Sequence, residues 1–389
     1  MSVVDGYVAP GFGGVADAFS VNFSERAEVG AALCVHHRGE VVVDLWGGVA
    51  DPATGRPWEA DTLCLVFSCT KGITATCVHL LIERGVLDPD ATVASYWPEF
   101  AANGKGDIPV RWLLGHRAGL AVIDADLTFD ESLSWFPVVE ALAAQAPNWE
   151  PGTDHGYHLR SYGWLVGELV RRVDGRTVGR FVAEELAGPL GLDVYVGLPA
   201  DLEARVATLV PPPPDFAALI ESLPDELLLG RATTGPSGHF SYTDMWNTRR
   251  LHEVELPSSN GIVSASSLSR MYAAVVGPVS GADGTTVGPV LHPTIVAAAT
   301  EVQSSGADRV IMVDTTFGLG YMLGSSMSPG CPPAAFGHPG AGGSLAFADP
   351  VADLGFAYVP NDLRFDPAET VRSTSLVEAT YQAIERATR

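Results

Sequence analysis

The sequence predicts an α/β (α+β) protein in which strands from both ends of the chain form one sheet and the middle forms a mainly helical insertion. Three observations support this prediction. β-rich runs fill the first hundred residues, helical patterns with Pro- and Gly-rich loops dominate from about residue 107 to 251, and short β-like runs return after residue 317. A chain of 389 residues usually forms two domains, or one domain with an insertion. We therefore assign residues 1–100 and 255–389 to an α/β domain and residues 101–254 to a helical insertion domain.

The first elements are two β-rich runs, Glu28–His36 and Glu40–Trp46, separated by three residues that include Gly39. This spacing predicts an antiparallel hairpin with a glycine-containing turn. A short apolar run, Thr62–Phe67, follows it and precedes the first long helix.

That helix is predicted over Ser68–Arg84. Ser68 fits the N-cap position, and Gly85 fits the position just past the C-terminal end. Apolar residues recur at three- and four-residue spacing, but the remaining faces are also largely apolar. A helix that is apolar nearly all round belongs in the centre of a protein.

Proline and glycine separate the later elements. Ser161–Val173 is predicted to be a helix closed by Asp174-Gly175, and Pro211–Pro214 must be a loop or an extended spacer. A terminal helix is predicted over Ala368–Ala387. Four short β-like runs precede it: Phe317–Leu323, Ala335–His338, Ser344–Ala348 and Leu354–Val359.

The composition excludes several classes of function. Acidic residues number 46 and basic residues 23, so the net charge is −23. Nucleic acids and anionic membrane surfaces are bound mainly through Lys and Arg, which makes both poor partners for this chain. The N-terminal segment lacks the basic and apolar regions of a secretory signal, and no apolar stretch reaches the about 18 residues of a membrane span. We therefore expect a cytoplasmic protein.

The cysteines indicate the same compartment. They are odd in number and form no CxxC, so we expect buried free thiols in a reducing cytosol and no structural zinc site. The sequence also lacks G-x-S-x-G and HExxH, which leaves an α/β-hydrolase elbow and a zinc protease unsupported. The five cysteines are Cys34, Cys64, Cys69, Cys77 and Cys331.

The strongest chemical signal is Ser68-Cys69-Thr70-Lys71 at the start of the central helix. Residues three apart on a helix share a face at about 5–6 Å between Cβ atoms, so this spacing presents a hydroxyl to an amine. A lysine can activate a serine only when neutral, and neutralising it at pH 7 from a pKa of about 10.4 costs about 4.6 kcal/mol. Burial and the helix N-terminus both lower an amine pKa, and the same terminus aims free N–H groups at a developing oxyanion.

The alternative is a capping serine followed by a lysine in the first turn, but the helix macrodipole disfavours lysine there. The chain has only two lysines, Lys71 and Lys105, and otherwise uses arginine as its cation. Because arginine cannot serve as a base, the position of Lys71 one turn from Ser68 favours catalysis.

Five sequence blocks add to this signal. They are Phe67–Ala75, Leu113–Leu120 (LLGHRAGL), Trp149–Thr153 (WEPGT) followed by Tyr157, Leu256–Ala265 (LPSSNGIVSA) and Phe336–Ser344 (FGHPGAGGS). In content and order they resemble the serine β-lactamase-related esterases, the family VIII carboxylesterases, which are relatives of class C β-lactamases and DD-peptidases. The resemblance implies a β-lactamase/transpeptidase-like fold, with an antiparallel sheet flanked by helices and the active site between the two domains.

The resemblance implies roles for three side chains. Ser68 would be the acylated nucleophile and Lys71 its partner base. Tyr157 falls where the family places a catalytic tyrosine, and a phenol near a cation loses its proton more easily and can shuttle it between serine and leaving group. The alternative for Tyr157 is an ordinary core or loop tyrosine.

The late glycine-rich block implies the rest of the site. His338 lies where penicillin-recognising relatives carry the lysine of K-T-G, and it would donate a hydrogen bond near the tyrosine or cap a strand. Backbone N–H groups of Ser68 and Ala341 would form the oxyanion hole. Gly340 and Gly342 would let the substrate approach the strand edge closely.

Two departures from the pattern bear on the substrate. The β-lactamases and peptidases usually carry a polar residue two positions after the tyrosine, where this chain has Leu159; the S-x-N at Ser258–Asn260 falls about a hundred residues too late for that role. Histidine replaces lysine in the late block. Both departures weaken recognition of a β-lactam or peptide carboxylate and favour a neutral ester.

We therefore predict a carboxylesterase-type serine hydrolase that cleaves small-molecule or short-chain esters through a Ser68 acyl-enzyme, without metal or cofactor. An acyltransferase on the same scaffold, an amidase, D-aminopeptidase or β-lactamase, and a catalytically silent binding protein are the alternatives. Acyl-chain preference depends on the pocket shape in the insertion, which carries no readable motif.

Overall fold

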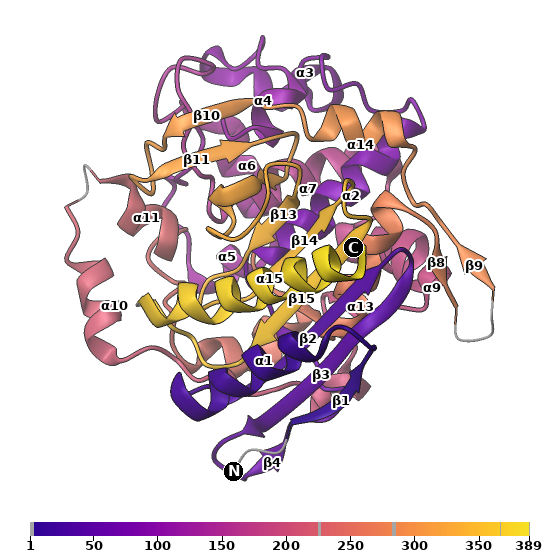
Figure 1. The fold of residues 1–389 in the computed structure, drawn as a ribbon. Helices are drawn as coiled ribbons and strands as arrows, with labels where there is room; N and C mark the ends of the chain where they lie inside the picture. The colour runs from indigo at the N-terminus through magenta and orange to yellow at the C-terminus, as the bar shows by residue number, and fades with distance from the viewer. Residues whose placement is uncertain (1–3, 225–226, 282–284, 366, 389) are drawn as a thin grey trace.

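The computed structural model describes residues 4–224, 227–281, 285–365 and 367–388. Within these residues, ten strands form one antiparallel sheet in the order β1-β3-β2-β15-β14-β13-β12-β11-β10, with β4 on β3. Strands from the two ends of the chain lie side by side where β2 pairs with β15 (Figure 1), which confirms the predicted fold class. The bounds are β1 Val4–Val8, β2 Gly30–His37, β3 Glu40–Asp51, β4 Arg56–Pro57, β10 Ser304–Ala307, β11 Asp314–Phe317, β12 Met322–Leu323, β13 Phe336–Pro339, β14 Leu345–Asp349 and β15 Leu354–Pro360.

The predicted hairpin is present as β2 and β3. Its turn holds Arg38 at a φ of 54° and Gly39 at 77°. Two successive left-handed residues match the right-handed twist of the flanking strands. The second strand continues to Asp51, beyond the predicted end at Trp46.

The run Phe317–Leu323 differs from the prediction, because it forms two short strands around a turn. Phe317 pairs with Met322, and Gly320 between them takes a φ of 87°. A Cβ at Gly318 would meet the carbonyl oxygen of Ala299 at 2.3 Å, so the turn depends on glycine at that close approach.

Helices cover both faces of the sheet (Figure 1). On β2, Leu33 and Val35 belong to the apolar cluster shared with α1 (Gly13–Glu25) and α15 (Pro367–Thr388). The alternate residues Ala32 and Cys34 belong to the cluster that contains α2 (Cys69–Glu83) and α13 (Ala265–Val276). The period of two along the strand therefore separates two apolar layers.

The central helix α2 is buried on every side from Cys69 to Leu81, as its uniform apolar composition predicts. A Cβ at Gly72 would lie 1.9 Å from the hydroxyl of Tyr272, so α13 packs directly on its backbone. The helix α7 (Ser161–Asp174) also packs on α2 and ends at Gly175 in the left-handed conformation, as predicted.

A second, three-stranded sheet joins the first part of the chain to the middle. It consists of β5 (Cys64–Leu65), β7 (Gly261–Val263) and β6 (Val194–Val196). The remaining elements are α3 Val93–Tyr96, η1 Pro98–Gly104, α4 Val110–Leu114, α5 Phe129–Leu133, α6 Trp135–Ala144, α8 Val178–Val182, η2 Ala183–Ala187, α9 Gly188–Leu190, η3 Ala200–Arg205, α10 Pro214–Glu221, α11 Leu228–Thr234, η4 Asp244–Asn247, α12 Arg249–Glu253, β8 Val279–Ser280, β9 Thr286–Val287, α14 Pro293–Ala299 and η5 Gly324–Ser326.

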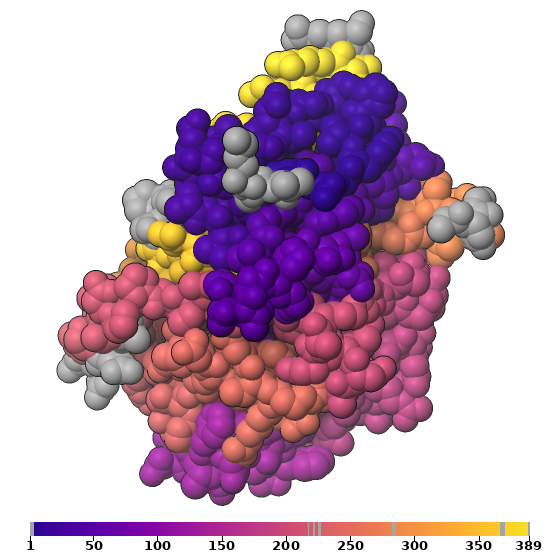
Figure 2. Space-filling view, turned by 90° about the horizontal axis from the view of Figure 1, so that it is seen from below, coloured from indigo at the N-terminus to yellow at the C-terminus, as the bar shows by residue number. Residues whose placement is uncertain are grey.

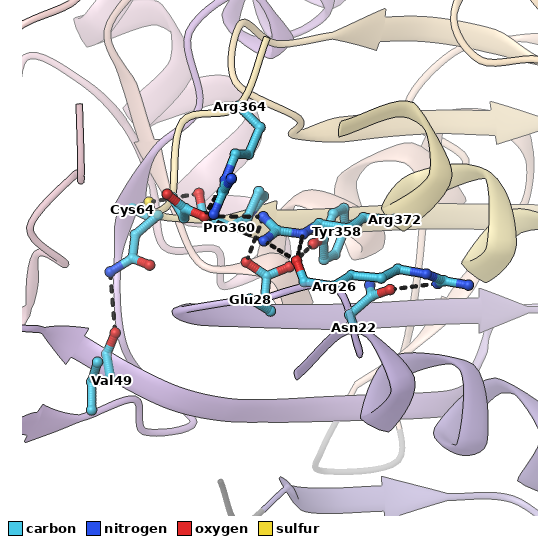
Figure 3. A network of polar contacts seen from close by, with 11 residues as sticks. Asn22, Arg26, Glu28, Val49, Cys64, Tyr358, Pro360, Arg364 and Arg372 are labelled. Atoms are coloured by element: carbon cyan, nitrogen blue, oxygen red, sulfur yellow. Dashed lines mark hydrogen bonds and ion pairs between the residues drawn. The ribbon is translucent and has the colours of Figure 1, made fainter. Parts of the chain in front are cut away.

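A buried polar network ties the ends of the chain together (Figure 3). Arg372 of α15 contacts Glu28 at 3.2 Å and Asp362 at 3.3 Å, and it donates to the carbonyl of Arg26 at 2.6 Å. The hydroxyl of Tyr358 donates to Glu28. Burial is the largest influence on Glu28 and raises its pKa to about 7, although Arg372 opposes the rise.

All five cysteines are free and buried, as predicted. In the part of the chain that the structure describes, no helix combines the length and the apolar character that crossing a membrane requires.

Candidate active site

Ser68 lies where the chain turns into α2. It occupies the N-cap position as predicted, but its hydroxyl does not cap the helix. Instead, Ser68 Oγ lies within hydrogen-bond distance of Lys71 Nζ, at 3.1 Å. The preceding residue, Phe67, has a φ of 42°, a left-handed conformation that is unusual for a bulky side chain. Such conformations concentrate at functional sites, where the surrounding fold imposes them.

Lys71 is fully buried, and its amine is held by two backbone carbonyls. Nζ donates to Leu159 O at 2.6 Å and to Ser258 O at 3.0 Å. A neutral amine has two N–H donors and one lone pair, so it can keep both carbonyl bonds and turn the lone pair toward Ser68 Oγ. No ion pair in the described residues joins Lys71 to a carboxylate.

The electrostatic surroundings disfavour the charged form of Lys71. Burial is the largest influence and holds its pKa well below the usual value, and the nearby charge of Arg160 lowers it further. The neighbouring Cys69 opposes these effects. These influences favour the neutral form of the amine, which is the form that a serine base requires.

Arg160 is a buried cation that joins the two segments contacting Lys71. The hydroxyl of Ser258 donates to the carbonyl of Arg160 at 2.8 Å, so the main chains beside Leu159 and Ser258 are tied together. The guanidinium lies 5.0 Å from the ring centroid of Trp246. It donates to the carbonyls of Thr233 and Phe240 and to the hydroxyl of Ser259.

The S-x-N segment, predicted to lie too far along the chain to replace the polar residue after the tyrosine, contacts the site through its main chain. Ser258 contributes its carbonyl to Lys71, while its side chain is directed to Arg160. Asn260 donates to the carbonyls of Leu251 and Val254 and braces its own loop. The block LPSSNGIVSA was the sequence signal for this segment, but nothing in it marks a main-chain contact to a lysine 187 positions earlier.

Tyr157 is buried with its ring beside the amine, 4.8 Å from Lys71 Nζ to the ring centroid. We expected a neighbouring cation to ease loss of its proton, but burial is the larger influence and raises the pKa of Tyr157 well above its usual value. The nearby Ser68 opposes the rise only in part, and the Tyr157 hydroxyl makes no hydrogen bond within the described residues. Burial therefore favours the protonated form of Tyr157 and the neutral form of Lys71.

Two residues outside the predicted set fix Tyr157. Its backbone N–H donates to both carboxylate oxygens of Asp308, at 3.0 and 2.9 Å. The ring of His116 meets the Tyr157 ring edge-on at 5.2 Å between centroids. The LLGHRAGL block contains His116, whereas no motif pointed to Asp308.

His338 lies against Tyr157, with stacked rings 5.5 Å apart. Burial, with Lys71 as the second influence, lowers its pKa to about 3, so the ring is neutral. Nδ1 contacts the carbonyl of Pro339 at 2.6 Å, and because a carbonyl only accepts, this nitrogen carries the proton. With the proton on Nδ1, Nε2 is an acceptor and has no partner within the described residues, so the donor role of His338 near the tyrosine stays a prediction.

The backbone N–H groups of Ser68 and Ala341 make no hydrogen bond within the described residues. A Cβ at Gly340 would meet Val66 O at 2.2 Å, so the glycine-rich turn lies against the segment that leads into Ser68. A Cβ at Gly342 would meet the Leu363 side chain at 2.4 Å. Internal packing thus requires glycine at both positions. The predicted reason for these glycines was that they let a substrate approach the strand edge.

Taken as a unit, the serine hydroxyl, the buried amine and the tyrosine lie at the start of a central helix beside an antiparallel sheet. This arrangement is typical of the serine hydrolases in which a lysine activates the nucleophile.

Comparison with known proteins identifies the family. A family model, Beta-lactamase, matches residues 12–380. Esterase/beta-lactamase LipL of Mycobacterium tuberculosis (strain ATCC 25618 / H37Rv) is 36% identical over 367 residues, which cover 92% of this chain and 83% of LipL. A solved family VIII carboxylesterase is 37% identical, with a TM-score of 0.86 over 98% of this chain and 100% of the other. EstA from Arthrobacter nitroguajacolicus Rue61a is 32% identical, with a TM-score of 0.87 over 98% and 99% of the two chains.

The chain therefore belongs to the β-lactamase family. These likenesses confirm the predicted fold and the predicted class of enzyme, a serine hydrolase of the esterase and β-lactamase type.

Proposed function

We propose that this protein hydrolyses carboxylic esters of small molecules through an acyl-enzyme on Ser68, with Lys71 as the base. The observation that carries the proposal is the position of the Lys71 amine, held by two carbonyls and 3.1 Å from Ser68 Oγ. With both N–H donors of the neutral amine engaged, its lone pair has the serine proton as its partner.

In the acylation step, Ser68 Oγ attacks the ester carbonyl while its proton passes to Lys71. The carbonyl oxygen becomes an oxyanion that accepts hydrogen bonds from the N–H groups of Ser68 and Ala341. Collapse of the intermediate breaks the bond to the alcohol, which takes up a proton and leaves. Water then attacks the acyl-enzyme by the same route and regenerates Ser68.

Tyr157 acts in this scheme as the proton donor to the departing alkoxide. Its raised pKa supports this assignment, since a phenol that holds its proton at rest is a donor and not a base. The Lys71 ammonium formed during attack lies over the ring and restores the proton after the alcohol leaves. His338 contributes a neutral ring that keeps Tyr157 in place by stacking.

The local chemistry favours an ester over a substrate bearing a carboxylate. Leu159 offers only an aliphatic side chain two residues after the tyrosine, and His338 is neutral where a lysine would carry charge. The names of the relatives, esterase/beta-lactamase and carboxylesterase, support the same substrate class.

The test combines labelling with turnover. A fluorophosphonate probe should label the folded protein, and vinyl acetate hydrolysis should be lost in Ser68→Ala but retained in the matched control Ser222→Ala, which changes an exposed serine. Product analysis with added alcohols separates hydrolysis from acyl transfer, and a nitrocefin assay measures lactam cleavage. Absence of labelling and of turnover in the unaltered protein would favour a silent binding protein instead.

A further inference from the structure

A pocket of about 700 Å³ is lined by residues outside the candidate active site. One wall consists of the proline run and α10, and the other is the segment that follows β15. Its apolar lining includes Phe216, Leu219, Leu363 and Phe365. Figure 2 shows the surface of residues near 215, in pink, beside that of residues near the C-terminus, in yellow, at one edge of the molecule. The chemical steps proposed for Ser68 make no use of this pocket.

The pocket wall is continuous with the glycine-rich turn that carries Ala341. The N–H of Arg364 donates to Gly342 O at 3.4 Å, and the side chain of Leu363 lies against the Cα of Gly342. The N–H of Leu363 donates to Val210 O at 3.0 Å, which joins the two walls. The turn that carries the proposed oxyanion hole and the pocket wall are therefore in direct contact.

A row of aromatic rings makes a second connection. The ring of Tyr242 meets that of Phe67 edge-on at 5.3 Å, and Phe67 directly precedes Ser68. On its other side, Tyr242 lies 5.0 Å from Phe365, which stacks on Phe216 at 4.1 Å with planes 13° apart. Four rings thus lead from the nucleophile into the pocket.

The charges and the aromatic surfaces of the lining residues indicate which chemical groups the pocket can bind. Its charged residues are two carboxylates, Asp215 and Asp362, and one guanidinium, Arg364, which pairs with Asp362 at 2.7 Å. This balance disfavours an anionic group. Flat aromatic and proline surfaces favour a neutral ring, because rings pack well by offset stacking and edge contacts.

We propose that this pocket binds a neutral, ring-bearing group of the ester substrate, and that Phe216 and Phe365 determine specificity for it. The inference deepens the proposed function and depends on it, since the ring must be part of an ester that Ser68 cleaves. The group that we expect in the pocket is phenyl-like, and an ester can carry such a group on its acyl side or on its alcohol side.

The experiment compares three esters by proton release: vinyl acetate, which is small on both sides, methyl 3-phenylpropanoate, with a ring on the acyl side, and 2-phenylethyl acetate, with a ring on the alcohol side. The variants are Phe216→Ala, Phe365→Ala and the pocket-filling Leu219→Trp. Leu219 is 57% exposed, so this last change does not depend on repacking the core. Phe136→Ala is the control for loss of a phenylalanine ring, because Phe136 lies on α6, outside the pocket, and is as exposed as Leu219.

All three pocket variants should lower kcat/KM for one ring-bearing ester about 5- to 30-fold more than for vinyl acetate, mainly through KM. The ester affected shows whether the ring belongs to the acyl or the alcohol side. Phe136→Ala should leave the ratio between esters unchanged. Parallel changes on all three esters, or no change on any, would overturn the pocket proposal while Ser68-dependent vinyl acetate hydrolysis continues. Absence of that hydrolysis in the unaltered protein would overturn the proposed function and this inference with it.

Discussion

The two lysines of the chain occupy surroundings that are alike in most respects. Lys71 and Lys105 are both fully buried. The amine of Lys71 donates to two backbone carbonyls, and that of Lys105 donates to those of Ala102 and Gln145. Each lies near an aromatic ring, at 4.8 Å from the centroid of Tyr157 and 5.5 Å from that of Phe100. Burial lowers the pKa of both amines.

Three differences separate a structural lysine from the candidate base. Lys71 has the Ser68 hydroxyl as a third partner, the ring beside it is a phenol, and Arg160 adds a repelling charge. Lys105 lacks these neighbours among its recorded contacts in the described chain and connects two loops of the helical region. Burial and carbonyl partners therefore favour the neutral form of an amine in both places. In the residues that the structure describes, only at Lys71 does a hydroxyl group lie where the amine lone pair can accept its proton.

The largest expected effect comes from removing each amine in turn. Lys71→Met should lower kcat/KM for ester hydrolysis about 10²- to 10⁴-fold, because the proton acceptor is lost. Lys105→Met should leave kcat/KM within about twofold and lower the free energy of unfolding by about 1–3 kcal/mol, since two buried carbonyls lose their donor. Steady-state kinetics and urea unfolding measure the two effects. Equal losses of activity in both variants would contradict the distinction.

Tyr157→Phe makes the ring beside Lys71 chemically the same as the Phe100 ring beside Lys105. We expect kcat to fall about 10²-fold with little change in KM, because packing is kept while the proton donor is lost. Tyr7→Phe, at an exposed tyrosine, is the control. An unchanged acylation rate in pre-steady-state kinetics would remove Tyr157 from the mechanism.

Arg160→Gln tests the third difference. Since only neutral Lys71 accepts the serine proton, kcat/KM should rise with pH through the lowered pKa of Lys71 and then level off. The Arg160 charge helps to lower that pKa, so its removal should shift the rising limb to higher pH and reduce activity mainly at low pH. The surface variant Arg180→Gln should keep the original profile. If the rising limb of the pH profile does not shift in Arg160→Gln, burial alone accounts for the lowered pKa of Lys71.

The smallest effect on activity is expected at Glu28, a buried group with no part in the site. Its pKa is about 7 in the folded chain against 4.5 as the ordinary value. Between these pH values the folded state binds a proton that the unfolded state does not, so stability falls as pH rises, by on the order of 3 kcal/mol once pH exceeds 7. Glu28→Gln should flatten this dependence in urea unfolding measured from pH 5.5 to 8.5. The same pH slope in both proteins would show that Glu28 does not titrate in this range.

The sequence predicted local features well, because they depend on short spacings. The four residues from Ser68 to Lys71 placed hydroxyl and amine on one helix face, and the structure places them 3.1 Å apart. The β2–β3 hairpin followed from its turn in the same way. The sequence did not predict the turn at Gly318–Gly320, because the apolar residues on both sides of it are also typical of a single continuous strand.

Long-range features could not be predicted from residue types. Ser258 contacts Lys71 through a carbonyl, which every residue possesses. Arg160 acts on Lys71 through its charge at a buried position, and a sequence does not record burial. For the same reason, the sequence does not predict that burial raises the pKa of Tyr157. The pocket is lined by residues from two segments, 210–219 and 362–365, and no sequence motif predicts that these segments lie together.

The pairing of β2 with β15 has a consequence for the nascent chain. Strand β2 is made early, yet one of its edges has no partner until Leu354–Pro360 has been synthesised. The carbonyl of Ser258 and the ring of His338 also emerge long after Ser68. In the proposed mechanism, Ser68 therefore lacks these contacts while the chain is being made, and the free edge of β2 awaits its partner. The proposed base and tyrosine gain their complete surroundings only after residues as far along as His338 have left the ribosome.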